Sequence, residues 1–336
     1  MDAALSPNRL VFAGAPRNGE TSPQRAIVVW QRDNAGAWRA WGTGAPAGVP
    51  GLTQFERGGQ YAIIASTPVA WSLPALSNGA SIFATGQVLS YYGFPGVPTM
   101  GVLGEYQPAE AMRQAVAQAA AYDALNGART VTPALHLITA VAQASPGNDG
   151  TYLGRLPMST VMEYADIAAA QGGLLILDIQ IGWSNPLLEV RGYEEALLLP
   201  HVHVALDPEF ATRRKGYPPG EAIGSVTGDE VNAVQRYLGD LVRVNGLPPK
   251  ALIVHQFRDD MVLQPEAITS VPGIDLVIDM DGWGGPGAKL GGYERYAQSY
   301  YAPFAGFKLF YRWDTPLLTP SAVQGLPNPP HLIIYQ

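Results

Sequence analysis

The chain has 336 residues, of which 47% are hydrophobic and 15% charged, so it can bury a large core and wholesale disorder is excluded. Its formal net charge is −7 without any basic run, which argues against nucleic acid and an anionic membrane surface as partners. The lack of cysteine excludes disulfides and thiolate metal sites. No apolar run is long enough for a membrane span. The first residues, MDAALSPNRL, show no signal-peptide pattern, which fits a cytosolic protein and the mature part of an exported one equally well.

Short β-branched and aromatic segments, separated by Gly, Pro and Asn clusters, occupy the first part of the chain. AIVVWQRD and AWRAWG, for example, are separated by DNAG, as in a β-hairpin. No helical periodicity of useful length occurs here. We therefore predict a small all-β domain, similar to a β-sandwich, over residues 1–80, with an accessory role.

Buried strands and helices alternate over residues 81–336. Nearly continuous apolar runs predict eight strands of a parallel sheet covered on both sides, at 88–93, 131–138, 173–180, 202–208, 251–257, 275–281, 307–313 and 331–335. Helices are expected between them, at 108–125, 158–171, 186–198, 229–245, 265–271, 290–302 and 319–324. Eight β/α units in this length predict an α/β fold of the (β/α)8 TIM-barrel type.

A doubly wound open sheet is the competing fold. It would carry a Gly-rich dinucleotide fingerprint between a strand and a helix. The nearest match, GWGGPG at 282–287, is expected to open a loop at Pro286 rather than a helix. The barrel is therefore favoured.

Acidic residues follow several of the predicted strands at the carboxyl end, where barrel enzymes place their active sites. Asp207 and Glu209 stand two residues apart, so they share one face of an extended segment. Asp178 and Asp281 end two other strands. Several acids in one mouth would repel one another and raise some of their pKa values. We predict that Glu209 is the proton donor and that Asp207 tunes the pKa of Glu209 or orients the substrate. Asp281 or Asp178 is the predicted partner carboxylate. The alternative for each acid is that it only caps a helix or binds a loop N–H.

Further polar and aromatic residues at the same ends are predicted to bind substrate, because aromatic faces suit sugar rings and polar edges suit hydroxyls. They are Glu105, Tyr91, His136, Gln180, His255, Gln256, Trp283, Tyr311, Trp313 and Asp314. The alternative is that the aromatic residues merely fill a loop-rich mouth. His201 and His203 form an H-x-H pair, but at the opposite mouth, so no metal or cofactor is predicted there.

Carboxylates and aromatic residues, without a G-x-S-x-G elbow, point to glycoside hydrolysis with a carbohydrate substrate. Two other functions remain open. One is a non-catalytic carbohydrate-binding or cell-surface protein. The other is a divalent-metal hydrolase with Asp178, Asp207, Asp281 and His255 as ligands.

Two resemblances bear on these alternatives. The sequence Asp207-Pro208-Glu209 resembles the D-x-E pair of the peptidoglycan-cleaving muramidases of glycoside hydrolase family 25, which implies acid chemistry on Asp207 and Glu209 and a cell-wall glycan as substrate. A larger part of the chain, from SYYG through LDIQ, HVHVALDPEF and VIDMDGWGGP to IIYQ, is similar to a group of uncharacterised, exported bacterial barrel proteins. That similarity implies a barrel and an extracellular or cell-envelope location, and no particular reaction.

Overall fold

The computed structural model describes residues 11–13, 27–32, 38–41, 50, 61–65, 70–72, 81–127 and 129–336. The chain divides into two compact units: Met1–Asn78 with Leu241–Leu247, and Gly79–Asp240 with Pro248–Gln336. The predicted domain boundary at residue 80 and the predicted DNAG turn lie outside the described residues.

Five short strands are described before residue 73. Three of them form an antiparallel sheet in which β2 (Ile27–Arg32) lies between β3 (Trp38–Trp41) and β4 (Tyr61–Ala65). The other two, β1 (Val11–Ala13) and β5 (Ala70–Ser72), pair antiparallel with each other.

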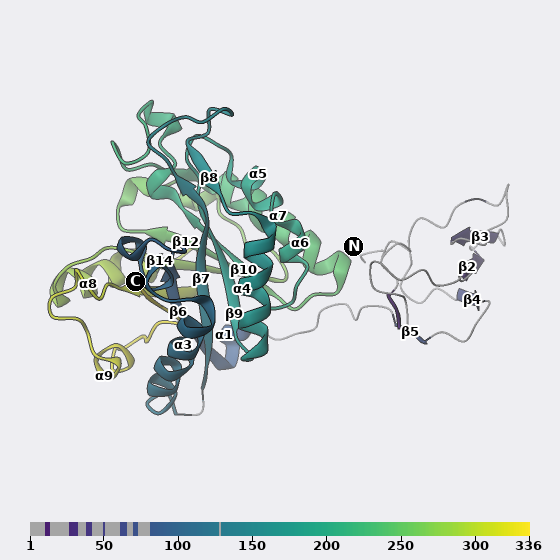
Figure 1. The fold of residues 1–336 in the computed structure, drawn as a ribbon, viewed down its shortest axis with the longest axis horizontal. Helices are drawn as coiled ribbons and strands as arrows, with labels where there is room; N and C mark the ends of the chain where they lie inside the picture. Colours follow the sequence, from purple (N-terminus) through teal and green to yellow (C-terminus); the bar gives the residue numbers. More distant parts are fainter. Residues whose placement is uncertain are drawn as a thin grey trace. The chain divides into compact units, whose positions relative to one another are not determined.

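Eight parallel strands close into a barrel (Figure 1). In chain order they are β6 (Gly86–Gly93), β7 (Thr130–Ala142), β9 (Leu174–Gln180), β10 (Val202–Asp207), β12 (Lys250–Gln256), β14 (Ile274–Met280), β15 (Phe304–Leu309) and β16 (Leu332–Tyr335). The first strand, β6, pairs with both β7 and the last strand, β16, so the sheet has no free edge. The predicted barrel is confirmed, and the open sheet is excluded.

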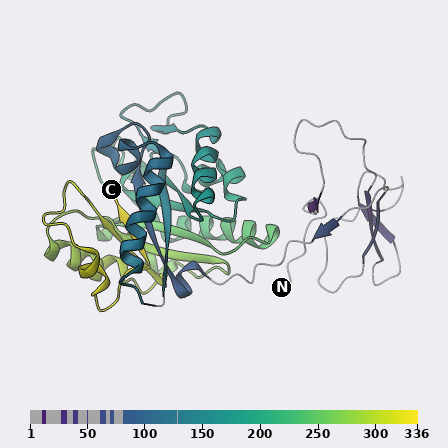
Figure 2. The ribbon, with the colours of Figure 1, turned by 60° about the horizontal axis from the view of Figure 1, so that its bottom comes forward.

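The first short helix precedes the barrel strands, and the other helices follow strands along the chain and cover the outside of the barrel (Figures 1 and 2). They are α1 (Ile82–Thr85), α2 (Val102–Glu105), α3 (Pro108–Asp123), α4 (Met158–Ala170), α5 (Pro186–Arg191), α6 (Glu194–Leu197), α7 (Gly228–Asn245), α8 (Pro286–Gly292) and α9 (Pro320–Gln324). Helix α3 begins with Pro108, where the missing N–H costs little. Its buried face packs on β6 and β7, and α4 packs on β7 and β9.

Shorter elements complete the loops between these strands and helices. They are the additional strands β8 (Leu153–Arg155), β11 (Val226–Thr227) and β13 (Val262–Leu263), the 3-10 turns at Pro98–Met100, Pro208–Phe210, Arg213–Lys215, Asp259–Met261 and Pro265–Ala267, and a π-helical turn at Tyr293–Ala297. Strand β8 extends the sheet antiparallel to β7, beside the barrel.

The inside of the barrel changes character along its axis. Toward the amino ends of the strands, the interior is a close-packed apolar cluster, which includes Val88, Ala134, Ile176, Ile253 and Ile334. Every second residue of a strand points inward. Two residues further along several of the same strands, the inward side chains are ionisable or polar. The apolar part therefore supports a polar floor near the carboxyl ends of the strands.

Several predicted elements differ in the structure. The helix predicted at 265–271 is only the 3-10 turn Pro265–Ala267, and the helix predicted at 290–302 is replaced by α8 and the π-helical turn Tyr293–Ala297. The seventh strand is β15, Phe304–Leu309, and not 307–313. It ends early because the N–H of Phe310 donates to the Asp314 carboxylate instead of continuing the ladder. The helix predicted at 186–198 is divided into α5 and α6 around Gly192. Pro286 opens helix α8 as its first residue, so the expectation of a loop there was wrong.

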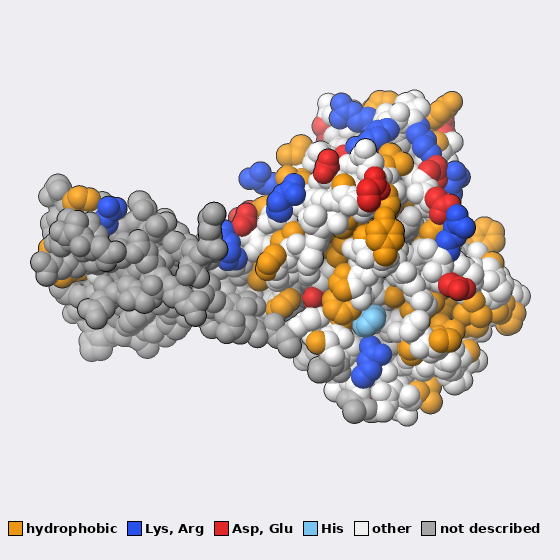
Figure 3. All heavy atoms as spheres, turned by 180° about the vertical axis from the view of Figure 1, so that it is seen from behind, with side chains coloured by type: hydrophobic (Ala, Val, Ile, Leu, Met, Phe, Trp, Pro, Cys, Tyr) orange, Lys and Arg blue, Asp and Glu red, His pale blue; other side chains and the backbone are white. Residues whose placement is uncertain are grey.

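On the face drawn in Figure 3, acidic and basic side chains are interspersed, and no broad basic area interrupts them. Within the described part of the chain, no helix combines the length and the hydropathy that a bilayer crossing requires.

Candidate active site

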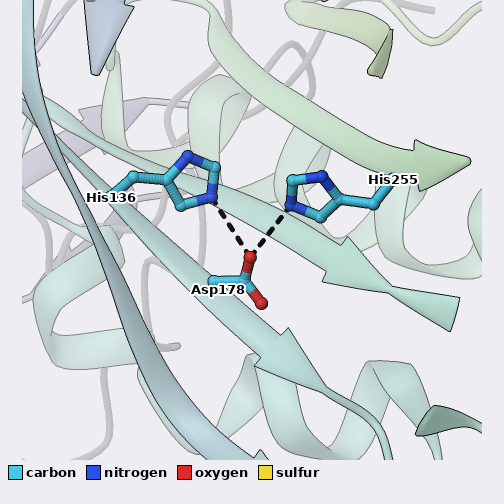
Figure 4. A group of neighbouring side chains, drawn as sticks. All are labelled: His136, Asp178 and His255. Atoms are coloured by element: carbon cyan, nitrogen blue, oxygen red, sulfur yellow. Dashed lines mark hydrogen bonds and ion pairs between the residues drawn. The ribbon is translucent and has the colours of Figure 1, made fainter. Parts of the chain in front are cut away.

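The polar floor of the barrel is built around Asp178, which lies on β9 and is fully buried. His136 of β7 and His255 of β12 approach the same oxygen of this carboxylate from two sides (Figure 4). The Nε2 atom of His255 lies 2.9 Å from Asp178 Oδ2 and forms a hydrogen bond with it. The Nε2 atom of His136 lies 3.3 Å from the same oxygen, but its direction does not meet hydrogen-bond geometry.

His255 connects this group to a second buried carboxylate. Its Nδ1 atom lies 2.8 Å from Oδ2 of Asp279 on β14. Burial alone would lower the pKa of His255, but its bonds to Asp178 and Asp279 outweigh burial and raise that pKa well above the usual value. At neutral pH His255 is therefore an imidazolium held between two aspartates.

The two neighbours of His255 differ in whether burial or the nearby charges determine the pKa. Burial would raise the pKa of Asp178, but the two histidines outweigh it and lower that pKa. Burial lowers the pKa of His136, and the carboxylate of Asp178 only partly opposes this. His136 is therefore a neutral ring beside the charged pair.

A glycine on the neighbouring strand makes room for Asp279. Gly306 of β15 lies opposite Asp279 in the sheet register. A Cβ atom at Gly306 would lie 2.8 Å from Oδ1 of Asp279 and 2.9 Å from its Cβ, which is closer than real contacts allow. The smallest residue at this position therefore lets Asp279 reach His255.

Lys308 of β15 and Asp281, just after β14, form a buried ion pair above this floor. The Nζ atom of Lys308 lies 2.8 Å from Asp281 Oδ1 and 3.7 Å from the centre of the Tyr92 ring. Burial alone would lower the pKa of Lys308, but the Asp281 charge outweighs it and raises that pKa. Lys308 therefore stays a cation, held between a carboxylate and an aromatic face.

Asp207 and Glu209 lie across the barrel at the end of β10. The Asp207 side chain is buried and accepts a hydrogen bond of 3.0 Å from the Glu209 backbone N–H. Burial, and then the nearby charges of Glu209 and Asp178, raise the pKa of Asp207 well above its usual value. Burial and the Asp281 charge also raise the pKa of Glu209, against the opposing effect of Lys308.

A cavity of about 650 Å³ opens over these groups. That volume is within the range of small-molecule sites. Its polar lining includes Gln180, Asp207, Glu209, Asp281, Lys308 and Gln336, and its aromatic lining includes Tyr92, Phe210, Phe257, Trp283, Tyr296, Phe310 and Trp313. Acidic groups from two strand ends, one lysine and a wall of aromatic rings thus share one opening.

The structure separates the predicted catalytic acids by depth. Asp207, Glu209 and Asp281 line the cavity, whereas Asp178 lies beneath it with no exposed surface. Asp178 contacts the two histidines and has no exposed surface that a substrate in the cavity could touch.

Eight of the ten predicted binding residues lie in or below the two cavities. Gln180, Trp283 and Trp313 line the cavity. His136 and His255 are buried below it, together with Asp178. Tyr91, Glu105 and Tyr311 line a second, adjoining cavity, which Trp313 also borders.

Gln256 and Asp314 have local structural partners. The Gln256 side chain donates to the carbonyl of Arg258 and accepts from the hydroxyl of Tyr301. The Asp314 carboxylate accepts from the backbone N–H groups of Gly284 and Phe310. Asp314 therefore stabilises the loops that carry the aromatic wall.

Sequence reasoning missed Lys308, which lines the cavity and pairs with Asp281. The signal for Lys308 was available, because GFKLFYRW contains a single lysine inside an apolar strand, two residues from Gly306 and from Phe310. Burial of an ammonium group in such a strand requires a partner.

The polar floor also contains groups that could hold a metal ion. His136, Asp178 and His255 offer ligand atoms within 4.8 Å of one another, and so do His255, Asp279 and Asp281. Both ring nitrogens of His136 and Oδ1 of Asp178 have no hydrogen-bond partner. The H-x-H pair lies elsewhere, as predicted: His203 Nδ1 accepts from the Ala251 N–H, and His201 contacts the Ala165 carbonyl.

Comparison with protein-family models and with curated protein sequences finds no match to this chain. The resemblances described above therefore remain predictions.

The raised pKa of Asp207 predicts a stabilising substitution. A carboxyl whose folded pKa exceeds its unfolded value, about 3.9, penalises folding increasingly as the pH rises between the two values. Asp207→Asn removes this penalty and keeps the acceptor for the Glu209 N–H. We expect it to raise the free energy of unfolding at pH 7 and to change it little at pH 4.

Urea unfolding at the two pH values measures this effect. The exposed Asp166 on α4 provides the control, since Asp166→Asn should change stability little at either pH. A loss of stability in Asp207→Asn at pH 7 would show that Asp207 is ionised and paired there.

Proposed function

We propose that this protein is a glycoside hydrolase that cleaves a polysaccharide by carboxylate acid–base chemistry at the carboxyl-terminal mouth of its barrel. The observation that carries the proposal is that three carboxyl groups and a wall of aromatic rings line one cavity. Glycoside hydrolysis needs a protonated carboxyl beside the leaving oxygen and a second carboxylate on the sugar ring or on the attacking water.

Glu209 is the proposed proton donor. It lines the cavity, and burial together with the Asp281 charge raises its pKa. A carboxyl with a raised pKa keeps its proton closer to neutral pH and can donate it to a leaving oxygen. Asp207 accepts the Glu209 backbone N–H and so fixes the position of this residue.

Asp281 is the proposed second carboxylate, acting as nucleophile or as base toward water. Its Oδ1 is held by Lys308 at 2.8 Å, and both residues line the cavity. The buried lysine fixes the position of this carboxylate through a charge-assisted hydrogen bond. In this account Lys308 is a positioning residue.

Aromatic rings would bind the sugar. Trp283 is 67% exposed and Trp313 is 45% exposed, although large aromatic side chains are usually buried more deeply. Such rings offer apolar faces to the C–H faces of a pyranose. A cell-wall glycan is the proposed substrate class, in keeping with the D-x-E resemblance, and the extracellular or cell-envelope location is proposed on the resemblance to exported barrels. The strands before residue 73 are proposed to belong to an accessory β-domain.

The test is a screen for new reducing ends across a panel of polysaccharides that includes peptidoglycan, chitin, β-glucans and xylan. We expect release from at least one glycan by the parent protein. Glycan binding without turnover across the panel would instead support the non-catalytic carbohydrate-binding function.

A divalent-metal hydrolase is the second candidate function. The favouring observation is the pair of unpartnered nitrogens on buried His136, next to Asp178 and His255. His255 also bonds to Asp279 through its other nitrogen, as metal-binding histidines do. The metal ligands predicted from the sequence did not include His136. They did include Asp207, which belongs to neither of the two groups that could hold a metal ion. Stoichiometric metal in the purified protein, with lower thermal stability after chelation, would support this function over the first.

A further inference from the structure

A second cavity of about 410 Å³ adjoins the first one. Thr99, Trp313 and Gln336 line both cavities, so the two share a wall. A ligand that fills both must therefore be longer than one that the first cavity holds.

The second cavity contains an exposed aromatic ring on a rigid support. The Tyr311 ring stacks on the Tyr335 ring, with centroids 5.0 Å apart and planes inclined by 24°. Its hydroxyl lies 3.3 Å from that of Tyr91, and Tyr335 in turn bonds to buried Tyr122 at 2.8 Å. Tyr335 packs against one face of Tyr311, and Tyr311 as a whole is 45% exposed.

Polar groups are present beside this ring. Arg312 and Glu105 form an ion pair of 2.6 Å at the rim, and both side chains are partly exposed. A guanidinium and a carboxylate offer donors and acceptors of the kind that bind neighbouring hydroxyl groups. Tyr106, which is 40% exposed, provides another aromatic surface.

We propose that this second cavity is an additional sugar-binding subsite, and that the substrate is an oligosaccharide chain that runs from the catalytic cavity past Trp313 onto Tyr311. The inference rests on the proposed function and deepens it, because it makes the enzyme selective for long chains. A rigid ring loses little conformational freedom when a sugar stacks on it, so Tyr311 would contribute to affinity.

The test compares Kd values for short and long chains by titration calorimetry. Chitobiose and cellobiose are the short probes, and chitohexaose and cellohexaose are the long ones. Binding is measured in a Glu209→Gln background so that no probe is hydrolysed. We expect Tyr311→Ala to weaken binding of the hexasaccharide that the parent binds by about tenfold, and to affect its disaccharide much less.

Two further variants keep the result interpretable. Tyr106→Ala removes another exposed ring of the same cavity. It should also weaken binding of the hexasaccharide, and it tests the subsite even if Tyr311→Ala folds poorly. Tyr300→Ala removes an 80% exposed tyrosine that lines neither cavity, and it should leave both affinities unchanged.

The outcomes separate the two proposals. Equal losses for short and long chains, or no loss in either cavity variant while the hexasaccharide still binds, would overturn the second subsite and leave the proposed function standing. A parent protein that binds none of the four probes and releases no reducing ends from any glycan would contradict the proposed function itself.

Discussion

Glu209→Gln is expected to lower kcat on the best glycan of the screen by a factor of about 10² to 10⁴, the usual contribution of a positioned general acid. Glutamine has nearly the same shape but carries no acidic proton for the leaving oxygen. The Kd for the same glycan should stay within a few-fold, because the cavity and its aromatic wall remain intact. Initial rates and calorimetric titration of the two proteins give both quantities.

The matched control is Glu221→Gln. Glu221 is exposed in a loop and lines neither cavity, so the same chemical change there should leave kcat unaltered. Substrates with a strongly acidic leaving group need less protonation, and they should lose less activity in Glu209→Gln. If Glu209→Gln turns over every substrate at the parent rate, Glu209 is not the acid.

Lys308→Met is expected to lower the free energy of unfolding by about 3–5 kcal/mol, the usual cost of leaving one member of a buried ion pair without its partner. Methionine retains much of the side-chain volume but removes the cation 2.8 Å from Asp281, so that this carboxylate keeps only the more distant His255, 3.7 Å away. It also removes the cation above the Tyr92 ring. Chemical denaturation monitored by tryptophan fluorescence measures the loss.

An exposed lysine provides the comparison. Lys215 pairs with Asp260 at 3.0 Å, but their side chains are 35% and 40% exposed. Lys215→Met should therefore cost at most about 1 kcal/mol. Adding Asp281→Asn to Lys308→Met should recover part of the lost stability, since no uncompensated charge then remains. Similar small losses in the two lysine variants would mean that Asp281 is solvated.

The barrel was predictable because its strands are apolar on both faces. Runs such as GGLLILDIQ and KALIVHQF differ clearly from the helical segments between them, and parallel strands bring their carboxyl ends to one side. That rule alone placed Asp207, Glu209 and Asp281 together. It needed no information on contacts between distant residues.

Because the strands are apolar on both faces, the sequence does not show which of their residues point into the barrel. In VLSYYG both alternating sets of residues are buried, so the pattern does not reveal that Tyr92 faces the barrel interior and Tyr91 the second cavity. An error of one residue in this alternation reverses the two faces. How deeply Asp178 lies in the barrel depends on the register of its strand against the neighbouring strands. The sequence of one strand does not determine that register.

The most direct measurement of the central claim is a crystal structure of Glu209→Gln with an uncleaved oligosaccharide. We expect one glycosidic oxygen to lie at hydrogen-bond distance, about 2.6–3.2 Å, from the side chain at position 209, with the anomeric carbon of the same bond facing Asp281. An oligosaccharide bound away from both side chains, or a cavity that stays empty at saturating glycan, would contradict the account.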